Sequence, residues 1–145
     1  MKNILLVSCV FPPEPVVSAR TSKDIADYLV GKDNKVTVLC PMPSRPAGKI
    51  HDGYFGKIFS IRRSTDVKSF EIVRLLAFPS SKSTLFNRLL ENVSFGFLSS
   101  VYMLFKCRKY DAIYLNTWPL FATAMNLWIA KFFRVPVVRS VQDIY

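Results

Sequence analysis

The sequence predicts an α/β fold: one domain with a doubly wound, mostly parallel β-sheet and helices on both faces. Short, continuous apolar runs recur along the chain, which is typical of strands buried on both faces. Segments with helical periodicity alternate with these runs. The first strand, helix and strand fit into roughly 40 residues, the size of a βαβ unit with a right-handed crossover. This alternation predicts a Rossmann-like sheet sandwich, and the 145 residues suit a single domain over 1–145.

The opening βαβ unit has clear boundaries. Residues 4–10 form an apolar run that three closely spaced prolines end, because proline lacks a backbone donor. Ser18 or Ser22 is suited to cap the following helix, which Gly31 is placed to end. Residues 35–40 form the second buried strand.

The remaining elements follow from the same patterns. We predict strands at 57–63, 70–76, 111–115 and 135–141, and helices at 83–107 and 119–133. The pattern does not decide whether the strands at 57–63 and 70–76 pair as a hairpin. The helix at 83–107 is amphipathic in its first half and apolar nearly all round after Val93, because Phe95 and Met103 fall on the formerly polar side.

Composition limits the function. The formal net charge of +10 favours an anionic partner, although a solvated basic surface has the same composition. The three cysteines have no metal-ligand spacing, so we expect no metal, and we expect Cys9 and Cys40 to act as small buried hydrophobic residues. His51 is the only histidine and lies in a polar loop, which leaves a catalytic cysteine without an obvious base.

Ligands of doubly wound sheets bind at the carboxyl ends of the strands. The loop after the first strand carries prolines, with neither a G-x-G-x-x-G motif nor a P-loop, so we expect no nicotinamide cofactor and no other cofactor. The loops at this edge offer the following polar side chains: Glu14, Arg20, Arg45, Lys49, His51, Asp52, Asn116, Thr117 and Asp143. Carboxylates beside basic groups suit hydroxylated, phosphorylated ligands. An equally good interpretation of Glu14 and Arg20 is that they only cap or pair with neighbouring groups and bind no ligand.

Four ordered motifs carry a resemblance that covers the whole chain. They are Phe11-Pro12-Pro13-Glu14-Pro15, the stretch Pro41-Met42-Pro43-Ser44 with Gly48-Lys49-Ile50-His51-Asp52-Gly53-Tyr54, Thr117-Trp118-Pro119-Leu120-Phe121, and Val141-Gln142-Asp143-Ile144-Tyr145. Together they resemble the N-terminal, acceptor-side domain of retaining glycosyltransferases of the GT-B fold. The most similar subgroup contains bacterial fucosaminyltransferases and glycosyltransferases of capsule and colanic-acid synthesis. Val16 and Val17 depart from that pattern, which has small residues after Pro-Glu-Pro.

The resemblance implies a hexosyltransferase-type enzyme built from two Rossmann-like domains. The domain seen here receives the acceptor, often a lipid-linked sugar, while a donor domain that this chain lacks grips the nucleotide sugar. We therefore expect the chain to be inactive alone and to need a separate donor-domain chain. Site residues implied by position are Glu14, Arg20, Lys49, Asn116 and Thr117 for substrate, with Asp143 and Glu14 as weak catalytic candidates.

Two other functions fit the same residues. The chain is either a truncated, catalytically dead product or a non-enzymatic module that binds a membrane surface with the same fold. Basic residues Lys82, Arg88, Lys106, Arg108 and Lys109 flank the long apolar helix, as in interfacial segments. We expect a cytoplasmic protein, peripheral to the inner face of the cell membrane, with no nucleic-acid partner. The competing interpretation buries the second half of this helix against the sheet.

Overall fold

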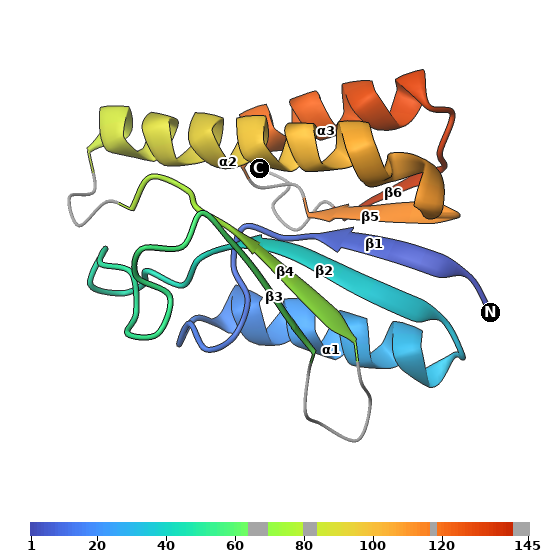
Figure 1. Cartoon of the computed structure of the whole chain (residues 1–145), viewed down its shortest axis with the longest axis horizontal. Coiled ribbons are helices and arrows are strands. Elements are labelled where there is room, and N and C mark those ends of the chain that lie inside the picture. The colour runs from blue at the N-terminus through green and yellow to red at the C-terminus, as the bar shows by residue number, and fades with distance from the viewer. Residues whose placement is uncertain (64–69, 80–83, 117–118, 141–145) are drawn as a thin grey trace.

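A six-stranded β-sheet with helices on both faces forms the protein (Figure 1). The computed structural model describes residues 1–63, 70–79, 84–116 and 119–140. One helix, α1, lies on one face of the sheet, and α2 and α3 lie together on the other (Figure 1). The predicted fold class, with helices on both faces of a mostly parallel sheet, is confirmed.

The elements follow the predicted order, with boundaries shifted by a few residues. They are β1 (Asn3–Val7), α1 (Val17–Gly31), β2 (Lys35–Pro41), β3 (Phe59–Arg63), β4 (Glu71–Leu75), α2 (Leu85–Lys106), the short 3₁₀ helix η1 (Cys107–Lys109), β5 (Ala112–Asn116), α3 (Leu120–Phe132) and β6 (Val137–Ser140). No helix among the described residues is both long enough and apolar enough to cross a membrane.

The strand order across the sheet is β3-β4-β2-β1-β5-β6. Neighbours are parallel except β3 and β4, which pair antiparallel with Ile61 opposite Val73, so these two strands do form a hairpin pair. The chain adds strands on one side of β1 and later returns to its other side with β5. The order therefore reverses between β1 and β5, and that reversal defines where a ligand crevice belongs.

Alternate side chains of the central strands pack into two separate cores. Leu5 and Val7 point toward α2 and α3 and join a core with Phe95, Met103 and the apolar side of α3. Leu6 points the other way and packs with Val36, Val38, Cys40 and Ala26 beneath α1. Because both faces of β1 are covered, the strand reads as one continuous apolar run in the sequence.

The start of α1 differs from the prediction. Neither Ser18 nor Ser22 caps the helix; its N-cap is Val16, which makes no side-chain hydrogen bond. Ser22 instead lies inside the helix, where its hydroxyl bonds the Ser18 carbonyl and the Ser8 hydroxyl, each at 2.8 Å. In this position the Ser22 hydroxyl provides a hydrogen-bond partner for the buried Ser8 hydroxyl in the loop after β1.

The second half of α2 has two apolar faces with different environments. Phe95 and Met103 are buried against α3 and the sheet, so the expectation that they reach a membrane is wrong. Val93, Phe97 and Leu104 lie on the opposite side and remain exposed. The apolar character all round the helix thus arises because one face is core and the other is open surface.

Helices α2 and α3 approach closely at Gly96. A Cβ at this position would lie 2.9 Å from the Cα and 3.2 Å from the amide nitrogen of Ala122. A polar pair adds to the contact, since the Asn126 amide donates to the Ser99 hydroxyl at 3.0 Å. The glycine is required here because the obstructing atoms belong to backbone, which cannot move aside as a side chain does.

We predict that Gly96→Ala lowers the free energy of unfolding by about 1–3 kcal/mol, because the added methyl forces the two helices apart. This loss should appear although alanine favours a helix by about 1 kcal/mol over glycine. Denaturant unfolding measures the effect. Gly31→Ala, at the exposed end of α1, is the control and should be neutral or stabilising. An unchanged midpoint for Gly96→Ala would show that the helix contact is looser than described.

Candidate functional site at the carboxyl edge of the sheet

The loops that follow β1 and β2 meet at the carboxyl edge of the sheet, where β5 also ends. These strands are neighbours in the sheet, and β1 and β5 flank the point where the strand order reverses. Ligands of open α/β sheets bind in the crevice outside this point.

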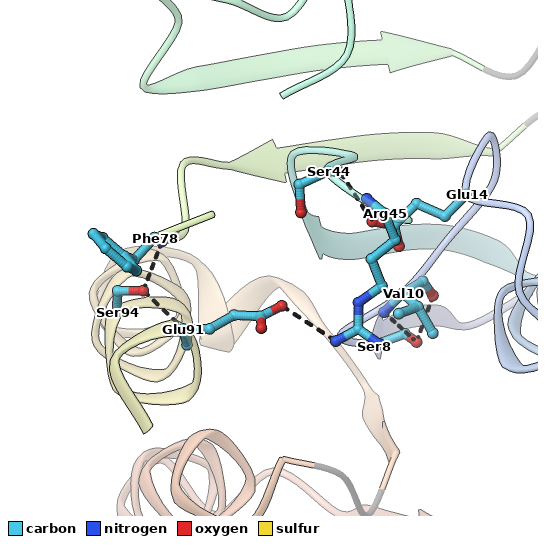
Figure 2. Close-up of polar contacts among 8 residues, drawn as sticks. All are labelled: Ser8, Val10, Glu14, Ser44, Arg45, Phe78, Glu91 and Ser94. Atoms are coloured by element: carbon cyan, nitrogen blue, oxygen red, sulfur yellow. Dashed lines mark hydrogen bonds and ion pairs between the residues drawn. The ribbon is translucent and has the colours of Figure 1, made fainter. Parts of the chain in front are cut away.

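Glu14 is buried between two of these loops. Its side chain is 6% exposed, and Oε1 accepts hydrogen bonds from the amides of Ser44 and Arg45 at 3.0 and 3.1 Å (Figure 2). The second oxygen, Oε2, is buried without a hydrogen-bond partner among the described residues. The carboxylate thus joins the loop after β1 to the loop after β2 and keeps one acceptor unused.

Arg45 continues the connection from the loop after β2 to helix α2. Its guanidinium donates to Glu91 Oε1 at 3.2 Å (Figure 2). Burial by itself would lower the pKa of Arg45, but the charge of Glu91 and its hydrogen bond raise it further than burial lowers it. The Arg45 carbonyl lies 2.9 Å from His51 Nε2, so the only histidine supports the loop. Arg45 is one of the loop residues predicted from the sequence, whereas Glu91 lies on α2 and is not among them.

Arg74 is a buried charge that the sequence analysis missed. It is 3% exposed and donates to the carbonyls of Pro41, at 3.1 Å, and of Pro12. Its guanidinium also lies 5.3 Å from the centre of the Tyr54 ring. The sequence does contain an indication of this role. An arginine inside an otherwise apolar strand is rare unless its donors are hydrogen-bonded, so Arg74 in this strand indicates a buried, paired guanidinium. Arg74 holds the proline loop after β1 against the end of β2.

The cysteines near the site are poor nucleophiles. Burial, partly offset by the charge of Arg45, raises the pKa of Cys9 to about 12. Burial, partly offset by Arg74, raises that of Cys40 to about 11. Both thiols are free and stay protonated near neutral pH; Cys40 is fully buried as predicted, whereas Cys9 is only partly buried.

The point between β1 and β5 contains little internal space. A cavity of about 10 Å³, lined by Cys9, Asn116, Thr123 and Asn126 among others, has room for roughly one water. The Thr123 hydroxyl donates to the Asn116 carbonyl at 3.0 Å and fixes the end of β5 against α3. A ligand of sugar size at this edge must therefore lie above the rim.

Glu14 and Arg20 line one groove, while Asn116 lines a different cavity. The groove measures about 360 Å³ and contains Pro12, Pro15, Val16, Val17 and Lys23 as well. Arg20 is exposed in the first turns of α1, and Lys49 is exposed on the loop after β2, outside both linings. Thr117 and Asp143 lie outside the described residues, so their positions stay predictions.

A hollow of about 680 Å³ lies at the opposite edge of the sheet. It is lined by residues at the amino ends of β1, β2 and β4 and by the end of α2, where the hydroxyls of Tyr102 and Tyr110 bond at 2.8 Å. Two of its three lysines, Lys106 and Lys109, complement the negative end of the α2 dipole. The hollow is remote from the crevice position of this fold, so we place the candidate site at the carboxyl edge.

The described residues contain no group of three His, Cys, Asp or Glu side chains placed to hold a metal ion. The groups that the edge does offer are carboxylates, guanidinium groups and backbone amides. Such groups recognise hydroxyls and phosphates by hydrogen bonding.

Comparisons with known proteins establish the fold but no family. No protein-family model matches the chain, and no curated protein sequence matches it. Among solved structures it is similar to the catalytic domain of starch synthase IV from Arabidopsis thaliana bound to ADP and acarbose. The TM-score is 0.62 at 11% identity, over 95% of this chain and 33% of that chain. The comparison shows the fold alone: the chain shares a Rossmann-like α/β fold with part of that catalytic domain. It spans about a third of the length of that chain, and the specific subgroup stays a prediction.

We predict that Arg74→Met lowers the free energy of unfolding by about 2–4 kcal/mol, because two buried carbonyls lose their donor. Thermal or denaturant unfolding measures the loss. Arg63→Met on the neighbouring strand β3 is the matched control, since Arg63 is exposed and its replacement should change stability by less than about 0.5 kcal/mol. Equal effects of the two substitutions would contradict the assigned role of Arg74.

We expect Cys9 and Cys40 to react with iodoacetamide at pH 8 at least about tenfold more slowly in the folded chain than in the urea-unfolded chain. Their raised pKa values leave little thiolate at that pH, so the rate should rise steadily between pH 8 and 10. Peptide mass spectrometry measures the extent of labelling at each cysteine. Rapid labelling of Cys9 at pH 7 would mean that its pKa is not raised.

Proposed function

We propose that this domain is the acceptor-side half of a glycosyltransferase that moves a sugar from a nucleotide sugar to a polysaccharide precursor. The GT-B type of fold supports sugar transfer as the general activity. The observation that carries the acceptor role is Glu14, which lines an open groove at the carboxyl edge and has one buried oxygen without a hydrogen-bond partner among the described residues.

Each site residue has a role in this proposal. Glu14 accepts a hydrogen bond from a hydroxyl of the sugar acceptor, and this bond is strong because the carboxylate is charged. Arg20 lines the same groove and faces a phosphate of the acceptor, while Lys49 adds positive charge from the loop after β2. Asn116 is the last residue of β5 and contacts the sugar in this proposal, as does Thr117, the next residue in the sequence. Asp143 and Glu14 are the weak candidates for accepting the proton of the attacking hydroxyl.

The acceptor in this proposal is lipid-linked, as the motif resemblance implies for capsule and lipopolysaccharide precursors. The domain would then work in the cytoplasm, peripheral to the inner face of the cell membrane. A donor-binding domain outside these 145 residues would supply the clamp for the nucleotide phosphates. Without that electrostatic stabilisation the leaving group cannot depart at a useful rate, so the chain alone should be inactive.

A second candidate function is favoured by a specific observation. The outer sides of α2 and α3 expose many apolar side chains, which fits a non-enzymatic module that binds a membrane surface. A truncated and inactive product would show the same surface. A gene for a lone donor domain beside this one would favour the divided enzyme, whereas the coding sequence for the rest of an enzyme after a stop codon would favour truncation.

The test uses a short-chain acceptor analogue, farnesyl diphosphate linked to N-acetylglucosamine, titrated into ¹⁵N-labelled chain. We expect shifts of the Ser44 and Arg45 amides, because both donate to Glu14. Glu14→Gln should weaken binding at least about tenfold, since the charged acceptor is lost while the side-chain shape remains. The chain without a donor domain should transfer no sugar from nucleotide sugars.

Asp24→Asn is the matched control, because Asp24 is an exposed carboxylate on α1, and it should bind the analogue as the unmodified chain does. The acceptor role is wrong if the rim amides do not shift or if Glu14→Gln binds equally well. Turnover by the chain alone would contradict the proposed need for a donor domain.

A further inference from the structure

The hollow at the amino edge of the sheet has no part in the proposed function. Its volume is about 680 Å³, and small-molecule sites usually measure roughly 300–1,000 Å³. Ile61, which lines the hollow, is opposite Val73, and Val73 packs in the core with Met103 of α2. Because residues opposite each other on paired strands point to the same face, the hollow lies on the α2 side of the sheet. It is the space between β3 and the second half of α2.

The lining of this hollow has an excess of positive charge. Four basic side chains contribute to it: Lys35, Arg63, Lys106 and Lys109. All four are exposed, and no ion pair within the described ranges joins any of them to a carboxylate. Against them stand the carboxylate of Glu71 and the negative end of the α2 dipole, which amounts to roughly half a charge. A positive excess of roughly two charges remains and favours an anionic occupant.

The four basic residues gather at the outer end of the hollow. Lys35 begins β2, and Arg63 is opposite Glu71, the first residue of β4. Lys106 ends α2, and Lys109 ends the short helix that follows. Since β3 and β2 lie two strand spacings apart, about 10 Å, their long basic side chains can reach one diphosphate placed between them.

The inner end of the hollow is aromatic and apolar. Along β3, Phe59 and Ile61 precede Arg63 on the same face. Along α2, Tyr102 lies one turn before Lys106. The rings of Phe59 and Tyr102 stack with their centroids 6.4 Å apart, so β3 and α2 meet there. Phe59 nevertheless stays 46% exposed and Ile61 54%, which leaves an apolar surface against which a flat group can lie.

Groups that can bind hydroxyls also line the hollow. The hydroxyls of Tyr102 and Tyr110 bond to each other at 2.8 Å, which uses one of their two protons and leaves the other for a ligand. Burial, and after it the hydrogen bond with Tyr110, raises the pKa of Tyr102, so this phenol stays protonated at neutral pH. The half-buried carboxylate of Glu71 can only accept hydrogen bonds. The hydroxyls of a ribose can both donate and accept, so they complement this pair of groups.

We propose that the hollow between β3 and α2 binds a nucleoside diphosphate, with its phosphates at the four basic side chains and its base against Phe59 and Ile61. The positive charge selects a phosphorylated ligand, and the base adds stacking that a free phosphate lacks. A single nucleotide fits better than a nucleic-acid strand, because the contact of Phe59 with Tyr102 ends the space that a strand would follow. This site lies at the edge opposite Glu14, so it does not depend on the proposed function.

Calorimetric titration of the chain with ADP, pyrophosphate and adenosine tests the proposal. We expect ADP to bind at least about fivefold more tightly than pyrophosphate, because only ADP has a base to stack. Adenosine should bind at least about tenfold more weakly than ADP, because its charge-assisted hydrogen bonds are lost. Added salt should weaken the binding of ADP, since the basic side chains are exposed.

Two variants separate the charged end from the aromatic end. Arg63→Met with Lys106→Met should weaken the binding of ADP and of pyrophosphate by at least about tenfold. Phe59→Leu should weaken the binding of ADP at least about threefold and leave that of pyrophosphate unchanged. The matched controls Lys32→Met and Tyr28→Leu replace an exposed basic and an exposed aromatic side chain of α1, on the other face of the sheet, and should bind ADP normally. Circular dichroism confirms that each variant is folded.

Amide spectra of ¹⁵N-labelled chain locate the ligand. ADP should shift the amides of Ile61 and Tyr102 and leave those of Ser44 and Arg45, at the carboxyl edge, unchanged. Glu14→Gln should bind ADP normally, so failure of this proposal and failure of the proposed function are distinguishable. The proposal is overturned if ADP does not bind, if it shifts the carboxyl-edge amides instead, if pyrophosphate binds equally well, or if the charge variant binds ADP normally. Tighter binding of an oligoadenylate than of ADP would overturn it in favour of a nucleic-acid strand.

Discussion

The buried carboxylate of Glu14 is the interaction on which the arrangement of the carboxyl edge depends. The sheet fixes only the ends of the loops that follow its parallel strands. The tips of these loops need further contacts to hold their positions relative to one another. Glu14 supplies one by accepting two amides from the loop after β2. Arg74 ties the proline loop to the end of β2, and Arg45 ties the next loop to α2. Three charged side chains thereby hold together the edge that ligands approach in this fold.

These contacts place charge where burial would normally disfavour it. A buried ion is tolerated only when hydrogen bonds replace its lost hydration. Arg74 meets this condition with two carbonyls and the face of Tyr54, and Arg45 with Glu91. Glu14 meets it on one oxygen only. An incompletely satisfied group at a ligand edge is a reasonable place for recognition, because a bound hydroxyl would complete its hydrogen bonds.

The sequence predicted the fold well because its main signals are local. Apolar runs of strand length, prolines that end them and helical periodicity all act within a few residues, and each predicted element exists within the described chain. The site was predicted less well. Glu14 and Arg45 were predicted as site residues because they lie on loops at the carboxyl edge. Glu91 and Arg74 were not, because they belong to a helix and a strand far away in the sequence. Only the folded chain brings those residues to the same edge.

The sequence alone determined the order of elements, the parallel βαβ opening and the edge at which polar loops gather, because these follow from hydrophobic period and chain connectivity. Tertiary structure decided which side of each element is covered. The periodicity of α2 shows apolar residues nearly all round and cannot say that Phe95 is core while Phe97 is surface. The tertiary structure also decided that Glu14 accepts a hydrogen bond from a backbone amide 30 residues away in the sequence. Burial and partner choice depend on what packs alongside, and that information is not local to any segment.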